Sequence, residues 1–198
     1  FPEYQESYVK QNSGFYPQQI IDEQNEDLET LSNTLKSLGV IVHRPNTKYA
    51  EKEIISPTWK GKNWSYYSPR DVTLIVGDTI IETPSPIWNR QFESWAYRDI
   101  FFKLFDEGYK WIKSPIPLLT EENYKDDTKG VPSLNNYEIL FEAANCVRVN
   151  NDILYQVSNT GNENGAKWLQ RVLGNDYKVH ITKNLYSYAH LDSTIVPL

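Results

Sequence analysis

The chain has 198 residues, enough for one domain with a real core, and its 39% apolar residues include 14 Tyr, 7 Phe and 6 Trp. A formal net charge of −6, with no run of Lys or Arg between aromatic residues, argues against a nucleic-acid partner. The single Cys excludes an internal disulfide, and the sequence has neither a signal-like start nor 18 consecutive apolar residues, so we expect a cytoplasmic protein with no membrane partner.

Three segments in chain order share one pattern, in which a helix ends at a glycine and a strand follows. The segments are 26–45, 90–115 and 162–184, with glycines at Gly39, Gly108 and Gly174. Glycine favours the position just past the last helical residue, because it adopts positive φ without strain. The third helix should begin within GNENGAKW, which lacks the spacing of a phosphate-binding loop.

A hairpin precedes each of the last two segments. The first, DVTLIVGDTIIE, covers 71–82 and turns at Gly77-Asp78; the second, NCVRVNNDILYQ, covers 145–156 and turns at Asn150 to Asp152. Overlaying them places Asp71 on Asn145 and Asp78 on Asp152. The sequence therefore predicts an α/β fold built from a repeated unit of strand, strand, helix and strand.

The two ends of the chain do not coincide with the ends of a repeat unit. The chain begins partway through one, and its last run, LDSTIVPL (191–198), overlays on RDVTLIV (70–76), which places Asp192 on Asp71. We therefore expect this run to be the first strand of a further hairpin. Residues 1–198 are interpreted as a single incomplete domain, a fragment of a longer protein.

Three polar residues, Asp71, Asn145 and Asp192, occupy matching places at the start of a first strand. A strand-entry turn in which Asp caps the backbone is the commoner reason for an Asp at the position of Asp71, and the same alternative applies to Asp192. His190 lies two residues before Asp192, so both would point to one face of an extended segment. Glu142 lies in an otherwise apolar strand and needs either a buried partner or access to water.

Cys146 is a candidate nucleophile, because Cys, His and a carboxylate together can support covalent catalysis. Its overlay on Val72, a hairpin core position, instead predicts a buried and unreactive thiol. His43 and His180 should lie in strands that follow helices and serve the structure. The chain has no motif with the spacing of metal ligands.

In combination and in this order, four stretches resemble the amidinotransferases, including glycine and inosamine-phosphate amidinotransferases. The stretches are PRDVTLIVGDTIIE (69–82), ESWAYRDIF (93–101), 141–180 beginning FEAANCVRVNND, and HLDSTIVPL (190–198). The resemblance covers about 27–198. It implies a five-unit α/β propeller of the pentein type, with about three units present here and the active site on the pseudo-fivefold axis.

The resemblance also implies roles for single residues. His190 of HLD matches the catalytic His and Glu142 of FEAAN the acid that orients it, while Asp71 and Asp192 match the carboxylates that hold a guanidinium. The glycine enzymes have FDAAD here, so Glu142 replaces an Asp, and Asn145 replaces a second Asp that contacts substrate. The family's nucleophilic Cys lies beyond Leu198.

The implied reaction transfers an amidino group from arginine to an acceptor amine through an amidino-Cys intermediate, with no metal or cofactor. Two alternatives stay open: a guanidine hydrolase of the same superfamily, in which water replaces the amine, and a non-catalytic domain that binds guanidino compounds. A homodimer is compatible with all three.

Overall fold

The computed structural model describes residues 14, 16–49, 52–63, 66–125, 133–185 and 189–197. The chain divides into two compact parts, Phe1–Arg44 and Pro45–Leu198. Whether both belong to one domain stays a prediction. Across the described ranges, every helix is too short or too polar to cross a membrane.

The first part contains the predicted helix but not the predicted strand. Helix α2 covers Gln18–Ser37, and Gly39 follows it with φ of 81°. Residues 40–44 have no regular structure, so the expectation of a strand here, with His43 in it, is wrong. A strand needs a neighbour for its hydrogen bonds, and the rest of the described chain in this part is almost entirely helix.

The second part contains two complete copies of the repeat unit, as predicted. In each copy an antiparallel hairpin is followed by a helix and then by a strand parallel to the hairpin's second strand. The first copy is β3 (Thr73–Val76), β4 (Thr79–Glu82), α4 (Arg98–Asp106) and β5 (Lys110–Lys113). The second is β8 (Cys146–Val149), β9 (Asp152–Val157), α5 (Glu163–Leu173) and β10 (Lys178–Lys183), which contains His180 as expected.

Both predicted hairpins are present, but their predicted overlay is shifted by one residue from the observed register. Val76 pairs with Thr79, and Val149 pairs with Asp152, so each turn has two residues. Asp152 therefore corresponds to Thr79 rather than to Asp78, and the same shift places Asn145 on Val72. The turns need positive φ, which Gly77 (58°) and Asn150 (55°) supply.

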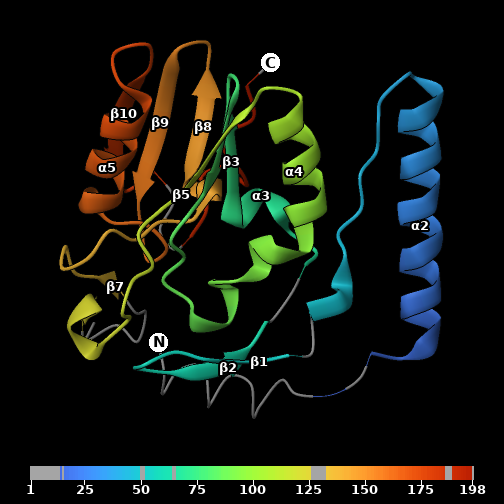
Figure 1. The fold of residues 1–198 in the computed structure, drawn as a ribbon, viewed down its shortest axis with the longest axis horizontal. Coiled ribbons are helices and arrows are strands. Elements are labelled where there is room, and N and C mark those ends of the chain that lie inside the picture. The colour runs from blue at the N-terminus through green and yellow to red at the C-terminus, as the bar shows by residue number, and fades with distance from the viewer. Residues whose placement is uncertain are drawn as a thin grey trace. The chain divides into compact units, whose positions relative to one another are not determined.

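The two copies pack against each other through one apolar core. In Figure 1, β3 and β8 lie next to each other, with α4 on one side and α5 on the other. Their buried side chains form a single cluster: Leu74, Val76, Ile81, Phe141, Ala143, Cys146, Ile153, Tyr155, Ala166 and Leu169. A second cluster, between β4 and α4, consists of Val72, Ile80, Ala96, Tyr97 and Phe101. Burial of this apolar surface holds the first strands of both copies together.

The helix expected from residue 90 begins later, at Arg98. Before it, η2 (Trp88–Arg90) and η3 (Glu93–Tyr97) form separate 3₁₀ turns. Buried polar side chains of this segment bond elsewhere: Gln91 donates to the carbonyl of Ser85, and the Ser94 hydroxyl donates to Glu82. These bonds hold the buried side chains against the core, whereas a regular helix would expose some of them to water.

Short elements complete the described chain. They are η1 (Thr47–Tyr49), β1 (Glu53–Ile55), β2 (Lys60–Lys62), α3 (Pro69–Val72), η4 (Glu121–Asn123), β6 (Tyr124–Lys125), β7 (Ser133–Leu134) and η5 (Ala143–Asn145). The strand expected at 191–198 is absent from its described part, 191–197. Instead, the amides of Thr194 and Ile195 donate to the carbonyl of Leu191 in a turn.

The glycines that end the helices provide a stability test. Gly108 has φ of 98°, and a Cβ there would meet open space, so Gly108→Ala adds backbone strain without a clash. We expect the free energy of unfolding in urea to fall by about 1 to 2 kcal/mol. Gly14→Ala is the control, because Gly14 also faces open space but without positive φ. Equal stability of the two variants would contradict the strain at Gly108.

Candidate active site

A buried carboxylate and an imidazole form the centre of the candidate site. Glu142 precedes the turn η5 and has no exposed surface, which excludes the alternative that it reaches solvent. It lies after an isolated bridge at Phe141 rather than in the strand expected from sequence. The Nε2 atom of His190 lies 2.5 Å from Oε2 of Glu142. Residues 48 positions apart thus form a direct acid–histidine pair.

Backbone hydrogen bonds bring His190 to this position. The amides of Leu191 and Asp192 both donate to the carbonyl of Ala144, at 3.0 and 3.2 Å. The Gln156 side chain donates to the carbonyl of Ala189. The segment around His190 is therefore fixed to η5 and β9, and its imidazole reaches Glu142.

Asp71 reaches the same imidazole from the other repeat unit. It lies in α3, directly before β3, and its Oδ1 is 3.7 Å from Nδ1 of His190. Asp71 and Glu142 therefore flank the two ring nitrogens of His190. The sequence predicted this convergence, and the structure brings the three residues together.

An arginine that the sequence analysis missed lies beneath these carboxylates. The Arg90 guanidinium, in η2, is 2.9 Å from Asp71, 3.0 Å from Glu93 and 3.1 Å from Glu142. Its side chain is only 8% exposed. The Ser85 hydroxyl also donates to Oε1 of Glu142, at 2.7 Å. Glu142 is therefore bonded on both oxygens.

The surroundings of the pair raise the pKa of His190 and lower the pKa of Glu142. Burial alone would lower the pKa of His190, but its hydrogen bond with Glu142 and the charges of Glu142, Asp71 and Asp192 raise it. Burial alone would raise the pKa of Glu142, but His190, Arg90 and Ser85 hold it below its usual range. The pair therefore favours an ionised Glu142 beside a protonated His190.

Two further predicted residues lie next to the pair. The backbone amide of Asp192 bonds to η5, and its charge contributes to the raised pKa of His190. Asn145 is fully buried, and its side chain hydrogen-bonds with the hydroxyls of Ser158 and Thr160. Its predicted contact with substrate therefore requires a change in these bonds.

Cys146 lies in the core, as predicted. It is 1% exposed, in β8, among the apolar side chains between the two sheets. Burial raises the pKa of its thiol to about 12, although Arg70 opposes this. A thiol with such a pKa contributes almost no thiolate near neutral pH.

Asp71, Glu142 and His190 each offer an atom within 4.8 Å of the others, a spacing at which acidic groups and histidine can surround a cation. Arg90 already bonds both carboxylates. A metal ion would therefore lie beside a permanent positive charge, and the arrangement suits a proton or a hydrogen-bonding cation better.

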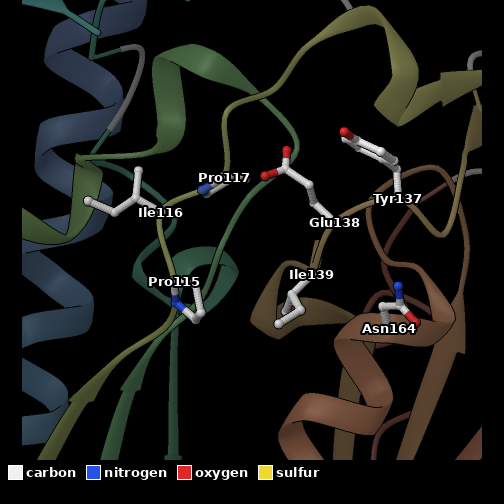
Figure 2. Close-up of a pocket in the computed structure, with 7 residues that line it drawn as sticks. All are labelled: Pro115, Ile116, Pro117, Tyr137, Glu138, Ile139 and Asn164. Atoms are coloured by element: carbon white, nitrogen blue, oxygen red, sulfur yellow. The ribbon is translucent and has the colours of Figure 1, made fainter. Parts of the chain in front are cut away.

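A pocket of about 240 Å³ lies elsewhere, between the segment after β5 and the approach to η5 (Figure 2). Its lining is Pro115, Ile116, Pro117, Tyr137, Glu138, Ile139 and Asn164. The Glu138 carboxylate accepts from the amides of Leu118 and Leu119 and from the Asn123 side chain. Glu138 therefore ties loops together, and none of the predicted site residues lines this pocket.

One sequence signal could have pointed to Arg90. Arg90 and Glu93 are three residues apart within PIWNRQFESWAY (86–97), a stretch rich in aromatic residues. Charged residues are seldom fully buried unless they are paired, so an aromatic stretch with one of each sign indicates a buried ion pair. Nothing in the sequence indicates that Asp71 and Glu142 complete it.

Two copies of a strand, strand, helix and strand unit, with an acid–histidine pair beside them, define an α/β protein built from the repeat unit predicted from sequence. The comparisons with known proteins name its relatives. No protein-family model matches the chain. It is 42% identical over 199 residues to inosamine-phosphate amidinotransferase 1 of Streptomyces glaucescens, covering 99% of this chain and 57% of that protein.

Two further relatives agree. The L-arginine:L-lysine amidinotransferase of Pseudomonas savastanoi pv. phaseolicola is 37% identical over 206 residues, covering 100% of this chain and 57% of that one. The solved inosamine-phosphate amidinotransferase StrB1 of Streptomyces griseus superposes with a TM-score of 0.88 at 42% identity, over 96% of this chain and 55% of that one. The chain is therefore a homologue of the amidinotransferases and spans a little over half the length of these relatives.

The acid–histidine pair predicts how stability depends on pH. The folded-state pKa of His190 is raised, so its stabilisation is complete below the unfolded-state pKa and lost as the pH rises through the folded-state value. In Glu142→Gln, His190 loses the hydrogen bond and the nearest charge that oppose its burial, so its folded-state pKa should fall towards the unfolded-state value and stability should depend less steeply on pH over that window. We also expect a loss of about 3 kcal/mol near neutral pH, since Arg90 and His190 lose a buried partner.

Urea unfolding at several pH values measures how the free energy of unfolding depends on pH. NMR of the imidazole resonances follows the titration of His190 directly. The resonances of His43 and His180 serve as internal references, because the chain has three histidines. The same pH slope for Glu142→Gln and the parent chain would contradict the pairing.

The burial of Cys146 predicts slow chemical labelling. A thiol-reactive probe at neutral pH should modify the native chain at least about a hundredfold more slowly than the chain in denaturant, because the thiol is buried and protonated. Mass spectrometry of timed samples gives the rate. Rapid labelling of the native chain would make Cys146 a candidate nucleophile again.

Proposed function

We propose that this chain forms the guanidino-binding and proton-transfer half of an amidinotransferase that takes its amidino group from arginine. The observation that carries the proposal is the pairing of His190 with the buried Glu142 beside Asp71, in a homologue of the amidinotransferases. The acceptor is an amine, in line with the lysine named in one relative. The protein works in the cytoplasm under this proposal.

The substrate guanidinium is held by Asp71 and Asp192. A guanidinium is planar and forked, so carboxylates bind it in a fixed orientation. Oδ2 of Asp71 bonds Arg90, which leaves Oδ1, the oxygen nearer His190, for the substrate. The bound guanidinium carbon would then lie next to Nδ1 of His190.

His190 exchanges its proton through Nδ1. An ionised carboxylate only accepts hydrogen bonds, so Nε2 stays protonated and donates to Glu142 throughout the reaction. A thiolate attacks the guanidinium carbon, Nδ1 gives its proton to the departing amine, and ornithine leaves. The acceptor amine then attacks the amidino-thioether carbon, Nδ1 takes a proton from it, and the thiolate is released.

The thiolate comes from outside these 198 residues. Cys146 is the only cysteine, and its burial in the core argues against this role. The chain alone should therefore bind arginine but not convert it. A hydrolase would use the same residues with water as the acceptor and release citrulline, whereas a binding domain would release nothing.

The test combines arginine binding with product analysis. Isothermal titration calorimetry should detect arginine binding to the chain, and Asp71→Asn should weaken it about tenfold or more, because a charged hydrogen bond to the guanidinium is lost. Asp152→Asn is the matched control, since Asp152 is exposed and bonds His180. Equal affinity of Asp71→Asn and the parent chain would contradict the guanidinium site.

The same proteins, incubated with arginine and a panel of amines, should form no ornithine at an enzymatic rate. Ornithine formation that Cys146→Ser abolishes would show that the nucleophile lies within this chain. Citrulline formation would favour the hydrolase. In each case chromatography of the amino acids identifies the product.

A further inference from the structure

Arg90 contacts both of the carboxylates that flank His190. It reaches Oδ2 of Asp71 and Oε1 of Glu142, the oxygens on the far side from the imidazole. Oε2 of Glu142 and Oδ1 of Asp71 are left to face His190. One guanidinium thereby determines which oxygen of each carboxylate is available to the site.

The burial of Arg90 makes this arrangement rigid. Its side chain is 8% exposed, and Glu93, which shares the guanidinium, is 1% exposed. Burial would lower the pKa of Arg90, but Glu142, Glu93 and Asp71 raise it, so it stays charged. A planar fork bonded on three sides has little freedom to turn, unlike a lysine ammonium.

We propose that Arg90 is a positioning residue that holds Asp71 and Glu142 as a fixed, ionised pair on either side of His190. Its part in amidino transfer rests on the proposed function, but its hold on the two carboxylates does not. Without Arg90, the buried Glu142 would lack a permanent counter-ion, and the carboxylates of both Glu142 and Asp71 would be free to rotate.

Loss of the Arg90 charge should shift the titration of His190 in a definite direction. The charged groups that face His190 are Glu142 from the approach to η5, Asp71 from α3 and Asp192 from its own segment. Arg90 reaches the imidazole through the first two. Replacing it with a neutral residue removes the counter-ion of the unprotonated pair, which carries a negative charge, so the pair should release its shared proton at higher pH.

Imidazole NMR titration of the purified chain measures this directly. We expect Arg90→Gln to shift the His190 midpoint to higher pH, and Arg90→Lys, which keeps the charge, to shift it less. Arg70→Gln is the matched control, because Arg70 donates to the carbonyl oxygens of Ala143 and Cys146 rather than to carboxylates. The His190 midpoint should stay at its parent value in this control.

A second variant should shift the His190 midpoint in the opposite direction. It also keeps the proposal testable if Arg90→Gln fails to fold. Glu93→Gln keeps the shape of the side chain but removes a negative charge that shares Arg90, so the His190 midpoint should move to lower pH. An unchanged midpoint in a folded Arg90→Gln or in Glu93→Gln, or an equal shift in Arg70→Gln, would overturn the proposal. The titration uses no arginine, so its failure is distinct from failure of the guanidinium site.

Discussion

The carboxylate of Glu142, which has no contact with water, is the constraint on which the site depends. An isolated charge in that position would be very unfavourable, so the fold must bring it partners from separate elements. Ser85 and Arg90 come from the segment after β4, and His190 comes from near the end of the described chain. The two repeat units and the segment around His190 are therefore joined by one buried group.

The repeat was predictable because it rests on local signals. The glycines that end the helices all have positive φ. The first hairpin turns at Gly77-Asp78 as predicted, and the second turns at Asn150-Asn151, one residue shorter than the predicted turn. Such features depend on a few neighbouring residues, so a pattern search finds them. The helix start at Asn162, whose side chain accepts from the amide of Gly165, is of the same kind.

Other features depended on contacts between distant residues and were not predictable. The one-residue register error arose because Asp78 and Asp152 look equivalent in sequence, whereas strand pairing makes Thr79 the match of Asp152. The run after Leu191 has the composition of a strand but forms a turn in its described part. Strand formation needs a partner, which composition does not reveal.

The candidate site was predicted in part for the same reason. The motif resemblance pointed to His190, Glu142 and Asp71, and the structure brings them together. Arg90 was missed because its role comes from three carboxylates on different segments, two of them far from it in sequence. A residue that interacts only through tertiary contacts leaves little trace in a linear pattern.

The bonds made by Arg70 have a consequence for how such a protein can change over evolution. Its guanidinium donates to the carbonyl oxygens of Ala143 and Cys146, so it bonds the main chain rather than side chains. Every amino acid offers the same carbonyl group, and substitutions at 143 or 146 that fit the core would leave this link between the repeat units intact. The contact between the two units therefore tolerates changes in the side chains around Glu142 that a contact between paired side chains would not.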